Sequence, residues 1–168
     1  MTHGIVTAPQ PEAVEVGSLI LRDGGNAVDA AISSALVQTV VDPMMCGIAG
    51  FGSLQLYIPE KNFHGFIDFH TTAPSSVKED MWEDQIAHEA RDGFGFILKN
   101  RANEVGYESI MTPGTLKGFY EAIQEFGTMP WADIIQPAID FAEEGFTISP
   151  AIDEFWDRSA GHGRISMD

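Results

Sequence analysis

Basic side chains are scarce in this sequence. Nine Lys and Arg stand against 25 Asp and Glu, which gives a net charge of −16. Nucleic-acid binding needs basic groups that displace phosphate counterions, so nucleic acid is an improbable partner. An anionic membrane surface is disfavoured for the same reason, and no apolar run approaches the ~20 residues of a membrane-spanning helix. The acidity is typical of a soluble, self-repelling surface, with adaptation to a salty habitat as the minor alternative.

Cysteine and targeting signals are also nearly absent. The single Cys46 has no partner for an internal disulfide and no CxxC partner for zinc. A small buried residue is its expected role, with a reactive thiol as the alternative. The N-terminus, Met1-Thr2-His3-Gly4, lacks the basic and apolar regions of a signal peptide, which predicts a cytoplasmic protein. A periplasmic or secreted protein would need a leader ahead of these residues.

Motifs for metals and cofactors are missing as well. The sequence has five histidines: His3, His64, His70, His88 and His162. No two of them lie at i, i+4, so we expect no metal site, and we expect His88 to be a surface residue. The glycines of 47–52 follow a helix pattern and precede a strand pattern, the reverse of a dinucleotide-binding turn, and no P-loop motif occurs. We therefore predict neither a metal nor a cofactor.

What the sequence does contain is enough apolar material for a real core, at 44% hydrophobic and 10% aromatic residues. Its organising stretch runs from Gly24 to Gly52. Two glycines end one helix, and Asn26 begins the next because its side chain accepts free N–H groups of a first turn. Asp42-Pro43 ends that second, largely apolar helix, and a glycine-rich loop follows.

The periodicity of the remaining chain predicts a mixture of helices and short strands. In order, we expect a strand at 4–8, helices at 10–23 and 26–41, a β-hairpin of 51–58 and 63–69, a helix at 77–91, an ordered loop at 93–106, a short strand or extended entry at 107–112, and helices at 115–126 and 131–144. Pro137 inside the last of these would kink it or mark where a second helix begins. The pattern fades after Ala151, and 161–164 has the composition of a frayed tail.

Three blocks resemble one enzyme family, in that family's order. The first is Gly-Gly-Asn-Ala-Val-Asp-Ala-Ala, beginning at Gly24, together with the glycine-rich loop. The second is Asp-Phe-His-Thr-Thr-Ala-Pro, from Asp68 to Pro74. The third extends from Pro113 to Phe146. Together they resemble the N-terminal part of the large subunit of γ-glutamyltransferases (γ-glutamyl transpeptidases) and their acylase relatives.

The resemblance implies a fold, a reaction and a partner. The fold would be α/β, the N-terminal portion of an αββα Ntn-hydrolase sandwich that is incomplete alone. Residues 1–150 would form the large-subunit N-terminal region, and 151–168 a tail or the start of the remainder. The reaction would be acyl transfer from a γ-glutamyl-type amide, as in glutathione metabolism, in a precursor that cleaves itself. The substrate would be a small acidic or γ-glutamyl-type molecule.

The family's nucleophile, a threonine that opens the small subunit with a Thr-Thr-His-like signature, is not found here. Thr71-Thr72 is followed by Ala73 and belongs to a different motif. Thr2, exposed if Met1 is removed, precedes a large-subunit start and is a decoy. We therefore assign no catalytic residue to this chain and predict that it is inactive alone. Its partner would be the C-terminal remainder or small subunit with the threonine. The alternative is a non-catalytic fragment or binding partner.

One substrate-binding residue follows from the resemblance. His70 stands where the family has an arginine, which is implied to clamp the substrate α-carboxylate by two charged hydrogen bonds. Histidine offers one such bond, and its charge is partial near neutrality. The plain alternative is a turn residue at a strand end. From strand alternation we expect Asp68 to face away from His70.

Overall fold

The computed structural model describes residues 4–91, 93 and 95–161. Two compact units divide the chain. The first is formed by Met1–His70 and Pro113–Asp168, and the second by Thr71–Thr112.

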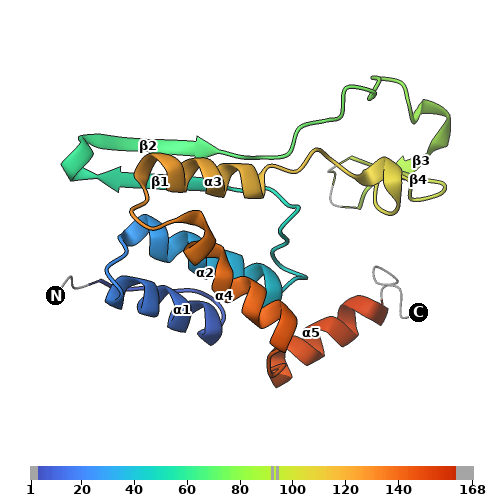
Figure 1. Cartoon of the computed structure of the whole chain (residues 1–168). Helices are drawn as coiled ribbons and strands as arrows, with labels where there is room; N and C mark the ends of the chain where they lie inside the picture. Colours follow the sequence, from blue (N-terminus) through green and yellow to red (C-terminus); the bar gives the residue numbers. More distant parts are fainter. Residues whose placement is uncertain (1–3, 92, 94, 162–168) are drawn as a thin grey trace. The chain divides into compact units, whose positions relative to one another are not determined.

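The first unit holds helices and one hairpin (Figure 1). Its elements are α1 (Pro11–Arg22), α2 (Ala27–Val41), β1 (Ser53–Ile58), β2 (Phe63–Asp68), α3 (Thr115–Phe126), α4 (Trp131–Glu144) and α5 (Pro150–Gly161). These bounds confirm the helices predicted at 10–23, 26–41, 115–126 and 131–144 and the predicted hairpin. Helix α4 runs through Pro137 as one helix, whereas α5 was not predicted.

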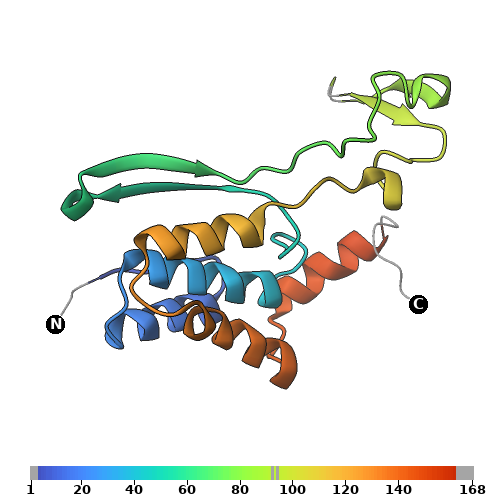
Figure 2. The same cartoon turned by 45° about the horizontal axis from the view of Figure 1, so that its top comes forward.

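Helix α2 lies at the centre of this unit. Figures 1 and 2 both place it between α3 and the pair α1 and α4. Its apolar side chains Ile32, Leu36 and Val37 are fully buried. Its hydroxyls bond in two directions: Ser33 Oγ donates to the carbonyl of Ile134 (2.9 Å), and Ser34 Oγ to that of Ala13 (2.7 Å). A helix covered on several sides has no single apolar stripe, which agrees with its nearly uniform apolar sequence.

The start of α2 explains the Asn-Ala-Val-Asp part of the first sequence block. Asn26 accepts the N–H groups of Val28 and Asp29 at 2.8 and 3.0 Å, and Asp29 accepts the N–H of Asn26 at 2.8 Å, a capping box. The same residues reach the end of α3. Asn26 Nδ2 donates to the Phe126 carbonyl (2.7 Å), and Asp29 accepts the N–H of Thr128 (3.0 Å). Both polar residues are therefore structural.

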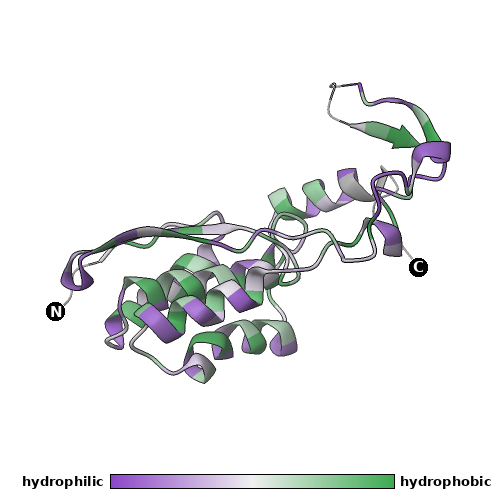
Figure 3. Cartoon of the chain, turned by 90° about the horizontal axis from the view of Figure 1, so that it is seen from above, coloured by the Kyte–Doolittle hydropathy of each residue, from purple (hydrophilic) through white to green (hydrophobic). Residues whose placement is uncertain are grey.

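Strands β1 and β2 pair antiparallel, with Ser53 opposite Asp68 and Ile58 opposite Phe63. One face packs on the helices: Leu56 is buried, and the Phe63 ring lies 4.7 Å from the Phe126 ring. The other face is exposed. In Figure 3 the helices next to the hairpin carry both hydrophobic (green) and hydrophilic (purple) residues, as expected for helices that bury one face in the core.

The predicted strand at 4–8 is wrong. Gly4–Ala8 forms no strand, and Ile5 is 93% exposed. The segment is apolar because it packs on α1 instead. Val6 lies so close to Gly17 of α1 that a Cβ on Gly17 would come within 2.8 Å of the Val6 side chain. A short apolar run cannot by itself separate pairing in a sheet from packing on a helix.

The second unit contains a small hairpin in place of the predicted helix at 77–91. Strand β3 (Ile86–Glu89) pairs with β4 (Phe96–Leu98), and a 3₁₀ turn at Glu83–Gln85 precedes it. In a helix, Glu79 would lie at i, i+4 from Glu83, and Asp80 from Asp84, and such like-charge pairs are destabilising. Gly93, with φ 75°, supplies the turn between the strands. The segment 93–106 is thus partly strand.

The ends of the second unit approach each other. Thr72 and Thr112 form an isolated antiparallel bridge, after a 3₁₀ turn at Tyr107–Ser109. The predicted extended entry at 107–112 is therefore extended only at its end. Across residues 4–91, 93 and 95–161, no helix is both long and apolar enough to cross a membrane. Of the frayed tail predicted at 161–164, only Gly161 is among the described residues, and it ends α5.

Candidate functional site

The end of β2 meets the glycine-rich loop and the start of α3 within the first unit. Two backbone hydrogen bonds hold the three segments together. The Phe69 N–H donates to the Gly52 carbonyl at 3.1 Å, and the Gly114 N–H donates to the Gly50 carbonyl at 3.2 Å. Segments about 60 residues apart in the sequence thus frame His70, the predicted substrate-binding residue.

Phe69 anchors this junction. Its ring is buried and meets Phe119 edge to face, with centroids 5.4 Å apart. A Cβ on Gly118 would lie 2.5 Å from the ring, and a Cβ on Gly114 would lie 2.2 Å from the Phe69 carbonyl oxygen. Real Cβ atoms do not approach so closely, so these positions require glycine. The ring thereby fixes the backbone that carries His70.

His70 is exposed and bonded to Asp68. One oxygen of Asp68, Oδ1, accepts the backbone N–H of His70 at 2.9 Å and lies 2.8 Å from its Nδ1. The expectation that Asp68 faces away from His70 is therefore wrong, because residues two apart along an extended chain share a side. The His70 side chain is 55% exposed and that of Asp68 is 63% exposed.

These contacts keep Asp68 ionised. The hydrogen bond from the His70 backbone N–H, followed by the one from its ring, lowers the pKa of the Asp68 carboxyl below its ordinary value. With Asp68 as acceptor, the ring of His70 donates from Nδ1, and Nε2 is the nitrogen left for another partner. The pair is thus an imidazole oriented by a carboxylate.

Phe51 completes the exposed surface beside the pair. Its ring centroid lies 5.3 Å from that of His70 with a tilt of 34° between the planes, and the residue is 64% exposed. Phe51 follows Gly50 and precedes Gly52, so the backbone contacts of these glycines position it. It had no predicted role; an aromatic between glycines that turn a loop was the available signal.

A cavity of about 450 Å³ adjoins this surface. It lies between α2, the glycine-rich loop, the start of β1 and α3, and its lining includes Phe51 and Phe69. The walls are mostly apolar. The hydroxyl of Thr115 is buried there with no hydrogen-bond partner among the described residues.

Cys46 lines the same cavity and is half-buried. Its Sγ donates to the carbonyls of Gln38 (3.3 Å) and Asp42 (3.5 Å). Burial, and secondarily the charge of Asp42, raise the pKa of the Cys46 thiol above its ordinary value. The residue is therefore a packed thiol rather than an activated nucleophile.

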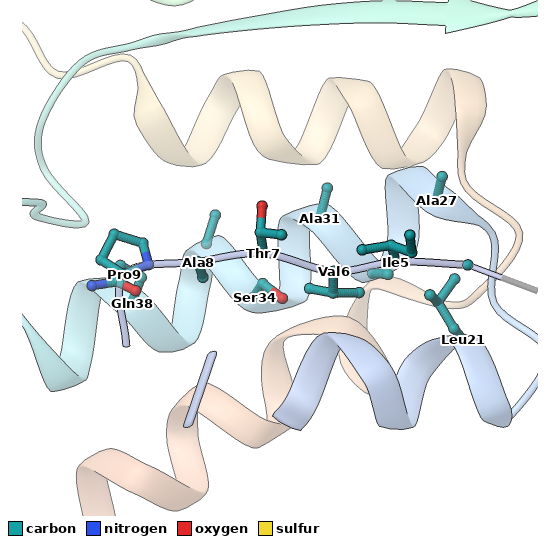
Figure 4. A pocket seen from close by; sticks show the side chains of 13 residues that line it. Ile5, Val6, Thr7, Ala8, Pro9, Leu21, Ala27, Ala31, Ser34 and Gln38 are labelled. Carbon is teal, nitrogen blue, oxygen red and sulfur yellow. The ribbon is translucent and has the colours of Figure 1, made fainter. Parts of the chain in front are cut away.

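A second cavity, of about 490 Å³, lies along the N-terminal segment (Figure 4). The segment Gly4–Pro9 runs beside α2, and the small side chains of Ala27, Ala31 and Ser34 line the space. None of the lining residues is an acid, a base or a cysteine. The hydroxyls of Thr7 and Ser34 line it without an acid or a base among the other lining residues, so the surface offers shape but no activated nucleophile.

Two of the other histidines lie on strands. His64 lies on β2 with its ring against Tyr57, and His88 is exposed on β3, as predicted for a surface residue. The part of the chain that the structure describes contains no group of three His, Cys, Asp or Glu side chains able to hold a metal. Thr2, His3 and His162 lie outside the described residues.

Comparison with known proteins identifies the family. The gamma-glutamyltranspeptidase family model matches residues 13–166. An acylase ACY 1 proenzyme from a Pseudomonas species is 41% identical over 152 residues, 89% of this chain and 26% of the relative. A glutathione hydrolase proenzyme of Pseudomonas aeruginosa is 34% identical over 146 residues, 87% of this chain and 24% of the relative. The chain thus spans about a quarter of these relatives.

The solved structures agree. A gamma-glutamyltranspeptidase from Pseudomonas nitroreducens matches with a TM-score of 0.79 and 32% identity, over 95% of this chain and 45% of that one. This confirms the predicted fold class, the N-terminal portion of an Ntn-hydrolase. The chain belongs to the gamma-glutamyltranspeptidase family of hydrolases and transferases.

Proposed function

We propose that the complete protein hydrolyses or transfers the acyl group of a γ-glutamyl-type amide. The nucleophile would be an N-terminal threonine from a later segment, the small subunit, released when the precursor cleaves itself. Its hydroxyl would attack the amide carbonyl while its own α-amino group accepts the proton. Water or an amine would then take the acyl group from the threonine. Family membership and the proenzyme names of the relatives support this proposal.

In this proposal, the present chain supplies one wall of the substrate site and no nucleophile. Residues 1–150 would be the large-subunit N-terminal region, and 151–168 would lead into the remainder. The observation that carries the proposal is the place of His70. It lies exposed at the end of β2, fixed by Phe69, at the position where the family has its arginine.

The histidine at position 70 also limits which acyl donors can bind well. A guanidinium donates two parallel charged hydrogen bonds to a carboxylate. His70 has already committed Nδ1–H to Asp68, so it can donate at most one hydrogen bond to a carboxylate, from Nε2 of the protonated ring. Losing one hydrogen bond to a charged group costs about 1.5–3 kcal/mol, or roughly 10- to 100-fold in affinity. We therefore expect ordinary γ-glutamyl donors to be poor substrates, unless another cation from the remainder holds the carboxylate of a small acidic donor.

The test compares two anilides in the complete protein. A γ-glutamyl anilide carries the α-carboxylate, and a 4-aminobutyryl anilide lacks it. His70→Arg should raise kcat/KM for the γ-glutamyl anilide about tenfold or more relative to the other. His64→Arg, at an exposed position of β2, adds the same charge and is the matched control. Efficient γ-glutamyl turnover in the parent that falls in His70→Arg would contradict the proposed role of His70.

A non-catalytic role remains the second candidate, because this chain contains no assigned nucleophile. The two candidates differ in the gene that encodes the chain. A continuing reading frame with an internal Thr-Thr-His-like segment, and two fragments after expression, would support the enzyme. A complete product without such a segment, and without turnover of either anilide, would support the binding partner.

A further inference from the structure

Asp68, His70 and Phe51 together offer three features that suit a cation. The first is the ionised carboxylate of Asp68. Both of its contacts with His70 use Oδ1, and the side chain is 63% exposed, which leaves Oδ2 open to a ligand. A carboxylate accepts hydrogen bonds and donates none. It therefore repels a substrate carboxylate and attracts an ammonium group.

The second feature is the free nitrogen of His70. With Nδ1–H donating to Asp68 at 2.8 Å, the neutral ring presents Nε2 as a lone-pair acceptor. An arginine at this position would keep several N–H donors after bonding to Asp68, whereas a neutral histidine keeps none. The replacement thus converts a donating surface into an accepting one.

The third feature is the ring of Phe51, which lies beside His70 and is 64% exposed. The face of an aromatic ring attracts a cation electrostatically, most strongly where water is excluded. The charge of the whole chain, −16, acts in the same direction, because a strongly acidic surface raises the local concentration of cations and lowers that of anions.

We propose that these three residues form a binding site for the primary ammonium group of the acyl donor. The inference rests on the proposed function and narrows its substrate class. One ammonium N–H would donate to His70 Nε2 and another to Asp68 Oδ2, with the charge beside Phe51. Any carboxylate of the donor would then lie elsewhere. Asp68 is a positioning residue for His70 as well as a ligand.

The experiment uses two further matched anilides with the complete protein. The 4-aminobutyryl anilide carries the amine, and the butyryl anilide is the same chain without it. The parent should prefer the amine in kcat/KM by at least about tenfold, the effect of one charged hydrogen bond. Asp68→Ala should abolish the preference. Asp68→Asn, which keeps an acceptor for Nδ1–H but removes the charge, should retain only part of it.

The control is Asp23→Asn. Asp23 is an exposed acid at the end of α1, near the start of α2. The proposed site adjoins the loop that follows the other end of α2, so Asp23→Asn removes one negative charge at a distance from the site. It should leave the preference unchanged. Turnover with no preference for the amine, or a preference that survives Asp68→Ala, would overturn the ammonium site and leave the proposed function intact. No turnover of any of these anilides would overturn both.

A second measurement tests the pair without activity. Nitrogen-15 NMR of labelled histidine in the complete protein distinguishes the two neutral ring tautomers, with His70→Gln to assign the signal. We expect His70 to carry its proton on Nδ1 in the parent and to lose that bias in Asp68→Ala. A parent ring protonated on Nε2 would show that Asp68 does not orient it and would refute the site.

Discussion

Asp29 is the residue whose removal should damage this chain most. Its side chain is fully buried, and its two oxygens accept hydrogen bonds from three residues. These are the N–H of Asn26 at 2.8 Å, the N–H and hydroxyl of Thr128 at 3.0 and 2.5 Å, and more weakly the N–H of Met129 at 3.4 Å. The carboxylate thereby joins the start of α2 to the turn between α3 and α4.

The size of the effect follows from these donors. Asp29→Ala would leave several buried donors without a partner, each at a cost of about 1–3 kcal/mol. With several donors left unpaired, the total cost is about 3–5 kcal/mol, a large share of the 5–15 kcal/mol of a typical domain. Asp29→Asn keeps the volume but sets an amide N–H against N–H donors, so we expect about 1–3 kcal/mol.

Local hydrogen exchange is the suitable assay, because a large protein need not unfold in two states. In the complete protein, amides of 26–30 and 126–131 should exchange about 100-fold faster or more in Asp29→Ala, since 1.36 kcal/mol corresponds to a factor of ten. Asp133→Asn is the control, because Asp133 is an exposed acid in the first turn of α4. Its interaction with the helix dipole contributes only about 0.3–1 kcal/mol. If Asp29→Ala exchanges no faster than Asp133→Asn, the junction does not depend on this carboxylate.

Three further outcomes are expected. Purified residues 1–168 should show no γ-glutamyl hydrolysis or transfer in an anilide assay, because a site without its nucleophile has nothing to position; turnover that Thr2→Ala abolishes would identify Thr2 as a nucleophile after all. The same chain should self-associate or lack a sharp melt, since the large aromatic side chains of Tyr57 and Phe66 on the hairpin are exposed. A monodisperse monomer with a cooperative transition in calorimetry and light scattering would contradict this. Because burial and the charge of Asp42 raise the pKa of the Cys46 thiol, iodoacetamide should alkylate Cys46 more slowly than glutathione at pH 8. The rate of alkylation should increase in Asp42→Asn. A reaction faster than that of glutathione would show that Cys46 is not a packed, unreactive thiol.

Local sequence signals were sufficient for helices α1 to α4 and the first hairpin. Asn26 with Asp29 three residues on is a capping pattern, and glycine or proline stops bound α1 and α2. The alternation of 53–58 and 63–68 fixes which face of the hairpin is buried. Each of these features depends on residues within about one turn of each other.

Features that depend on distant partners could not be predicted in this way. The segment 4–8 packs on α1 instead of pairing, and 86–89 becomes a strand because 96–98 folds back on it. At the site, the resemblance supplied His70, but the Asp68 contact was missed because positions two apart were assigned to opposite sides. The niche for Phe69 needs Gly52, Gly114 and Gly118 at one point, which no local pattern indicates.

The family motifs in this chain therefore contain two kinds of residue. Asn26, Asp29 and the glycines around Phe69 are held by buried contacts, so any change there costs stability whatever the substrate. His70 is different, since its side chain is 55% exposed and contacts only the neighbouring Asp68 and Phe51 among the interactions described. Folding places little constraint on the identity of residue 70. We therefore propose that the histidine, at the position where the sequence resemblance implies an arginine, is set by a group that it meets in the complete protein rather than by the packing of this chain.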